Sequence, residues 1–163
     1  MIDDVLEVWR VHEQINSLLL ERIPEAGFQA VTLLKNGQPS KGRTVSRVFA
    51  HLHNVRVMHL TREFRQGAEP FEDGASPGRK ELIAGLRASG RSVEARLAHV
   101  MKERVRIKDR PGAVLLGYLI AHESHHRGQI MLALKQSGIS MPDDVKWGIW
   151  THWFRAVPGA RAS

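Results

Sequence analysis

Apolar residues recur every three or four positions through almost the whole chain, and prolines and glycines mark the places where this pattern stops. A spacing of three and four puts side chains on one face of an α-helix, whereas a half-buried β-strand needs alternation. No strand-like alternation persists, and no internal repeat or low-complexity run is visible. The sequence therefore predicts an all-α protein. A chain of 163 residues is long enough for one domain with a sizeable core.

Two helices are expected in the first part of the chain. The first begins after Asp3 or Asp4, which are acidic residues suited to an N-cap, and it ends at Pro24. The second begins after Thr44, whose hydroxyl can cap a helix, and it finishes near Gly67. Each helix carries an apolar stripe, so both should pack against other helices.

Two longer helices are expected to follow. Ser76 and Pro77 supply an N-cap followed by proline at the first helical position, and the third helix should run from there to about Arg106. Pro111 opens a fourth, long helix. Gly138 comes directly before an apolar residue, which is the order of a Schellman cap, and it should close this helix.

A last, short helix should be capped by Asp143 or Asp144. Its tryptophans recur every three residues and predict a packing stripe over one end of the bundle: Trp147, Trp150 and Trp153. The connection over residues 29–41 is too long for a tight antiparallel neighbour. The sequence thus predicts a four-helix bundle with long crossover connections and a short C-terminal helix. One domain should span residues 1–156, followed by a frayed basic tail over residues 157–163.

Composition limits the function classes. The chain has no cysteine, which excludes disulfides, cysteine-ligated zinc, iron–sulfur clusters and a cysteine nucleophile. The N-terminus lacks the apolar region of a signal peptide, and no apolar stretch reaches membrane-spanning length, so we expect a cytoplasmic protein without membrane contact. The net charge is +7, but the basic residues are dispersed and stacking aromatics are few. Nucleic acid is therefore not the expected partner.

The histidines are the most informative feature for function. In the fourth helix, His122 and His126 fall in line with apolar residues, so both should project towards the bundle interior. Residues four apart on a helix lie about 5–6 Å from each other, which suits two ligands of one metal. In the second helix, His51 and His59 occupy a similar inward line. Three imidazoles that converge in a core need a metal or a carboxylate partner.

The spacing alone is a weak motif. With nine histidines in the chain, chance alone gives about 0.5 pairs at a spacing of four. The alternative is that these histidines are hydrogen-bonded residues of the core or of the bundle rim. Their position on the apolar stripe, with a third histidine on a facing helix, favours the metal site.

The run His-Glu-Ser-His-His-Arg-Gly-Gln-Ile over residues 122–130 resembles the fourth-helix signature of the DinB/YfiT-like four-helix-bundle family. Residues 45–52 resemble the second-helix segment that supplies the first metal ligand of that family. The resemblance spans almost the whole chain in helix order and loop lengths. Members of the family are associated with transfer or isomerisation reactions that use low-molecular-weight thiols, or with metal-dependent hydrolysis.

The resemblance implies a three-histidine site for a divalent metal and, commonly, a homodimer. On the matching positions the metal ligands would be His51, His122 and His126. His125 would then lie beside the site. Arg127 is expected to be an ordinary exposed arginine, with a carboxylate or phosphate contact near the site as the alternative.

The same helix also fits the zinc-protease pattern His-Glu-x-x-His, in which Glu123 would be the general base. The chain before His122 is predicted to be helical rather than a substrate-binding edge strand, and no third ligand follows at the metzincin spacing. Glu123 points about 100° away from His122 around the helix. A protease is therefore disfavoured, although Glu123 stays open as a base.

The leading hypothesis is a divalent-metal-dependent enzyme whose metal keeps an open position for water or a thiolate. Imidazole ligands favour zinc, with nickel as the second choice. The expected partner is a small molecule, and the favoured reaction transfers a low-molecular-weight thiol to a small electrophile. The alternatives are a metal-dependent hydrolase and a non-enzymatic, stress-associated metal-binding bundle. No catalytic acid or base can be assigned.

Overall fold

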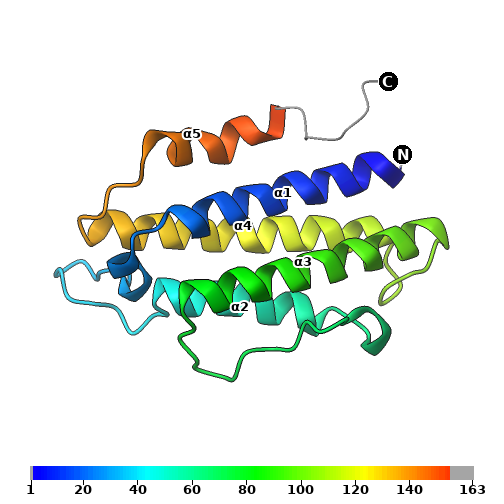
Figure 1. The fold of residues 1–163 in the computed structure, drawn as a ribbon, viewed down its shortest axis with the longest axis horizontal. Coiled ribbons are helices and arrows are strands. Elements are labelled where there is room, and N and C mark those ends of the chain that lie inside the picture. Colours follow the sequence, from blue (N-terminus) through cyan, green and yellow to red (C-terminus); the bar gives the residue numbers. More distant parts are fainter. Residues whose placement is uncertain (1, 155–163) are drawn as a thin grey trace.

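The computed structural model describes residues 2–154, so the tail expected over residues 157–163 lies outside the described part. The described chain forms five α-helices: α1 Ile2–Arg22, α2 Val45–Met58, α3 Arg79–Lys102, α4 Gly112–Gln136 and α5 Asp143–Thr151 (Figure 1). Strand-like pairing within residues 2–154 is limited to two isolated bridges. The prediction of an all-α fold is confirmed. None of the described helices is both long enough and apolar enough to cross a membrane.

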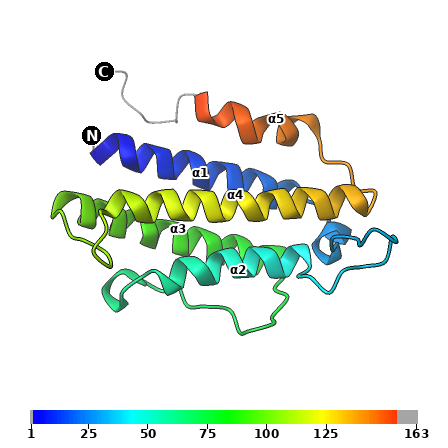
Figure 2. The same cartoon turned by 180° about the vertical axis from the view of Figure 1, so that it is seen from behind.

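Helices α1 to α4 form a bundle in which one connection crosses over along its length (Figure 1). Helix α1 packs against α3 and α4, and α2 packs against the same two helices, so α1 and α2 lie diagonally opposite each other (Figures 1 and 2). Helices α2 and α3 point in the same direction, and the connection over residues 59–78 therefore returns along the length of the bundle (Figure 1). The expected long connections are present, and they make α2 and α4 antiparallel neighbours.

Helices α2 and α3 both end earlier than the sequence predicted. They end at Met58 and Lys102 rather than near Gly67 and Arg106. After α2 the backbone becomes extended at Thr61, with ψ of 162°, and after α3 it enters the left-handed region, with φ of 52° at Arg104. A residue with positive φ cannot continue a right-handed helix.

Helix α3 also begins later than predicted. Gly78 is its N-cap, and the Gly78 N–H donates to Glu81 Oε2 at 2.8 Å. Pro77 lies before the helix because its carbonyl oxygen accepts a hydrogen bond from the Ser46 hydroxyl at 2.7 Å. This tertiary contact, and not the local Ser-Pro sequence, therefore determines where α3 begins.

The acidic residues at the starts of α1 and α5 lie inside the first turn instead of capping it. Helix α1 already includes Asp3 and Asp4, and α5 has Pro142 at its N-cap and Asp143 and Asp144 in its first turn. Carboxylates in a first turn interact favourably with the positive end of the helix dipole. These residues therefore favour the helix starts, although not as side-chain caps.

The end of α4 follows the prediction. Gly138 has φ of 73°, and its N–H donates to the Lys135 carbonyl at 3.1 Å. The Ile139 N–H donates to the Leu134 carbonyl at 2.9 Å. These two bonds define a Schellman cap, which is confirmed.

Helix α5 lies against α1 on the outside of the bundle (Figures 1 and 2). Its inner face holds Val145 and Gly148, where a larger side chain would collide with Leu18. Trp147 and Trp150 fall on the opposite face and are 67% and 66% exposed. The prediction that the tryptophans form a packing stripe is therefore wrong for these two residues.

A layer of buried polar side chains divides the bundle core into two apolar clusters. One cluster lies at the end that contains Leu19 and Leu52, and the other lies at the end that contains Trp9 and Leu119. The layer between the two clusters draws on all four bundle helices and consists of His12, Asn16, Arg56, Ser89, Glu123 and Arg127. We call this set the polar layer.

Candidate metal centre

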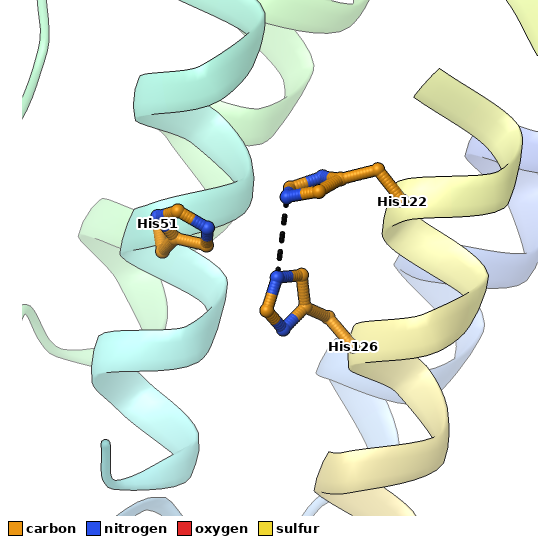
Figure 3. Close-up of side chains that lie close together, drawn as sticks. All are labelled: His51, His122 and His126. Atoms are coloured by element: carbon orange, nitrogen blue, oxygen red, sulfur yellow. Dashed lines mark hydrogen bonds between the residues drawn. The ribbon is translucent and has the colours of Figure 1, made fainter. Parts of the chain in front are cut away.

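Three histidines from two neighbouring helices meet beside the polar layer. His51 comes from α2, and His122 and His126 come from successive turns of α4. One ring nitrogen from each lies within 4.8 Å of the others, and the three side chains face one another (Figure 3). His126 is buried and the other two are half-buried. The structure thus brings together the three residues that the family resemblance implied.

The arrangement of the ring nitrogens fits a metal ion. The Nε2 atoms of His122 and His126 are 3.2 Å apart (Figure 3). Two nitrogens bound to one tetrahedral zinc at about 2.0–2.1 Å would be about 3.4 Å apart. The Nδ1 atom of His122 is buried without a hydrogen-bond partner among the described residues, so no described group fixes the tautomer of this ring.

All three imidazoles are held neutral at neutral pH. Burial lowers the pKa of His51 to about 4, and the positive charge of Arg43 adds to this effect. Burial is also the main cause that lowers the pKa values of His122 and His126. A metal binds the neutral form of imidazole, so protons compete weakly for these ligands.

Gln129 holds His126 in one tautomer. The His126 Nδ1–H donates to Gln129 Oε1 at 2.8 Å, which leaves the lone pair of Nε2 free on the side of the cluster. The Gln129 amide then donates to Nε2 of His125 at 3.0 Å. His125 is exposed and lies beside the cluster, as the resemblance implied, but it acts there through Gln129.

Two other histidines, His53 and His59, lie outside the cluster. His59, although on the same inward line as His51, stacks edge-on against Tyr118 with ring centroids 5.0 Å apart and lies outside the cluster. His53 is buried and bonds to the Glu69 carbonyl at 2.7 Å. From residue spacing, either His51 or His59 could be the third histidine of the cluster. The packing of α2 on α4 places His51 in the cluster and His59 outside it.

Glu123 is not available as a base. It is fully buried and accepts hydrogen bonds from Arg56 at 2.6 and 2.7 Å, from His12 at 2.8 Å and from Asn16 at 2.7 Å. Burial by itself would raise the pKa of this carboxyl, but the Arg56 guanidinium and the hydrogen bonds hold it well below its usual range. The protease hypothesis therefore has no general base at this position.

Arg127 is buried, so the expectation of an exposed arginine is wrong. Its guanidinium donates to Asn16 Oδ1 at 2.8 Å and to the Ser124 hydroxyl at 2.7 Å. It also contacts Nδ1 of His12 at 3.4 Å. Arg127 therefore belongs to the polar layer.

The partners of Glu123 were not predicted from the sequence. His12, Asn16 and Arg56 are fully buried, and each lies on the apolar stripe of its helix. Polar residues at helical spacing within an apolar stripe are a usable signal, because a buried polar group needs a partner. The pattern could have indicated a polar layer, although not which residues pair.

We predict that Arg56→Met lowers the free energy of unfolding by about 3–5 kcal/mol, because it removes the guanidinium that neutralises the buried Glu123 carboxylate. The matched control is Arg10→Met, which removes an exposed arginine from its pair with Glu94 and should cost no more than about 1 kcal/mol. Urea denaturation followed by circular dichroism measures both. Losses of equal, small size would contradict this account of the polar layer.

Comparison with known proteins agrees with this geometry. The sequence matches the DinB family over residues 1–152. It is 26% identical over 149 residues to "Uncharacterized protein YrdA" of Bacillus subtilis (strain 168), with 86% of each chain covered. No solved structure matches the sequence. The family match spans both helices that carry the histidine cluster, and the chain belongs to the DinB family, a metal-binding helical family.

Proposed function

We propose that this protein is a divalent-metal-dependent enzyme with a three-histidine centre formed by His51, His122 and His126. The observation that carries the proposal is the convergence of three neutral imidazoles within 4.8 Å of one another. Zinc is the favoured metal and nickel the second choice, since imidazole suits both and no thiolate ligand exists in the chain.

The chain's own residues prepare the site. His51 approaches from α2 and the other two histidines from α4, so the metal would bridge two antiparallel helices. Gln129 keeps His126 in the ligating tautomer, and the ring of Tyr118 stacks on His122 with centroids 5.6 Å apart. A divalent metal with three protein ligands keeps an open position and lowers the pKa of water or a thiol held there.

Metal content tests the ligand set. We expect about one divalent metal per wild-type chain, and a large loss of metal in His51→Ala, His122→Ala and His126→Ala. The matched controls are His53→Ala and His99→Ala, because neither ring belongs to the cluster. Elemental analysis of purified protein gives the answer. Wild-type stoichiometry in all three cluster variants would show that the assignment is wrong.

The favoured reaction is transfer of a low-molecular-weight thiol to a small electrophile in the cytoplasm, where such thiols are kept reduced. Two points support a nucleophile that comes from outside the chain. The sequence contains no cysteine, and Ser124, the hydroxyl nearest to the histidines along α4, is exposed and accepts a hydrogen bond from Arg127. The burial of Glu123 also removes the general base that a protease-like hydrolysis would use.

We predict thiol-dependent turnover of at least one compound in a panel of small electrophiles. The rate should fall by at least about 100-fold in His126→Ala, as expected when a metal-activated nucleophile is lost, and it should be unchanged in His99→Ala. Product formation is measured with and without bacterial low-molecular-weight thiols. Equal rates without any thiol would identify a metal-dependent hydrolase. No turnover with any compound would favour the non-enzymatic, stress-associated metal-binding bundle.

We also propose a homodimer that pairs through the outer face of α5. The family resemblance supports the dimer, and the exposed rings of Trp147 and Trp150 support the choice of surface. The double variant Trp147→Ser/Trp150→Ser should convert a dimer to a monomer in size-exclusion chromatography with light scattering. Leu34→Ser, which changes another exposed apolar residue, should leave the dimer intact. A wild-type protein that is monomeric at all concentrations would overturn the proposal.

A further inference from the structure

A small cavity lies between α2 and α4, one helical turn from the histidine cluster. Its volume is about 190 Å³, and its walls include Val48 on α2 and Gln129 and Ile130 on α4. Val48 precedes His51 by three residues, and Ile130 follows His126 by four. The cavity therefore begins about one helical turn, or about 5 Å, from the cluster along both helices.

Arg43 provides the only charged side chain in the described wall of this cavity. It lies just before Thr44, the N-cap of α2, and it is exposed. Among the described residues, no hydrogen bond or ion pair joins its guanidinium to a carboxylate. A guanidinium presents parallel N–H donors that match a carboxylate with two hydrogen bonds, and here these donors have no carboxylate acceptor within residues 2–154.

The charges around the cluster favour an anion. Arg43 acts on both His51 and His126, where its positive charge adds to burial in lowering their pKa values. The carboxylate that acts on His122 is Glu123, which lies in the polar layer and is paired there with Arg56. The negative charge of this carboxylate is thus already neutralised inside the bundle. A divalent metal on three neutral histidines would add further positive charge.

We propose that the small molecule that reacts at this centre carries a carboxylate, and that Arg43 binds this carboxylate in the cavity while the reacting atom lies at the histidine cluster. This inference rests on the proposed metal centre and deepens it by naming the substrate class. Arg43 is then a binding residue that sets specificity. Gln129 links the two parts of the site, because it lines the cavity and also accepts from His126.

The test uses Co²⁺-loaded protein and three thiols of equal length: 3-mercaptopropionate, 3-mercaptopropanol and 3-mercaptopropylamine. The sulfur-to-cobalt absorption band reports binding directly, without any enzymatic reaction. The wild type should bind the carboxylate thiol about 10-fold more tightly than the alcohol, the size expected of one charge-assisted contact at a partly exposed site. The amine should bind most weakly.

Two variants test whether Arg43, and not the metal, recognises the carboxylate of the thiol. In Arg43→Ala, the preference for the carboxylate thiol over the alcohol should fall to within about twofold. In Arg43→Glu, the amine should bind more tightly than the carboxylate thiol. The matched control is Arg47→Glu, which makes the same charge change on α2, where the Arg47 side chain points towards Gly74 instead of the cluster. It should keep the wild-type order of the three thiols.

Each outcome separates the two proposals. Cobalt that binds normally to a wild type without any preference for the carboxylate thiol would overturn the role of Arg43 and leave the metal centre intact. A preference that persists in Arg43→Ala would mean that the thiol carboxylate contacts the cobalt itself, and it would overturn the proposal in the same way. Failure of the wild type to bind cobalt would overturn the metal centre and, with it, the inference that rests on it.

Discussion

The buried ion pair between Arg56 and Glu123 is the interaction on which the rest of the bundle depends. Arg56 comes from α2 and Glu123 from α4, while His12 and Asn16 of α1 complete the hydrogen bonds of the carboxylate. Arg56 also donates to the Leu86 carbonyl of α3 at 3.1 Å. These hydrogen bonds therefore connect all four bundle helices at the same height along the bundle axis. A buried carboxylate tolerates few alternative arrangements, so this layer fixes how each helix is rotated about its axis.

The same layer positions the histidine cluster. Glu123 follows His122 directly, and the two side chains point about 100° apart around α4. When Glu123 is held in the core, His122 must face the groove between α2 and α4, and His126 lies one turn further along the same face. On α2, Arg56 points into the layer and His51 into the groove. The ion pair also neutralises the charge of Glu123 inside the bundle, and Arg43 is the charged residue that lines the cavity near the cluster.

The sequence predicted the helices better than their ends. Apolar spacing identified five helices, and the Gly138 cap was confirmed by two backbone hydrogen bonds, because a Schellman cap depends only on local geometry. The start of α3 was misplaced because the Pro77 carbonyl accepts a bond from Ser46, a residue far away in the sequence. Trp147 and Trp150 are exposed because α5 packs against α1 through its opposite face. The spacing of residues alone does not specify which face of a helix is buried.

By itself the sequence determined that the protein is a helical bundle with histidines on two helices, because helical periodicity and the spacing of His122 and His126 are properties of the chain. The resemblance of residues 45–52 and 122–130 to one family added the choice of His51. Only the tertiary structure decided the rest. It showed that Glu123 and Arg127 are structural, that His59 lies outside the cluster and that Arg43 stands next to it without a carboxylate partner among the described residues. The physical reason is that burial and pairing depend on which helix faces come together, and this is set by contacts between residues distant in the chain.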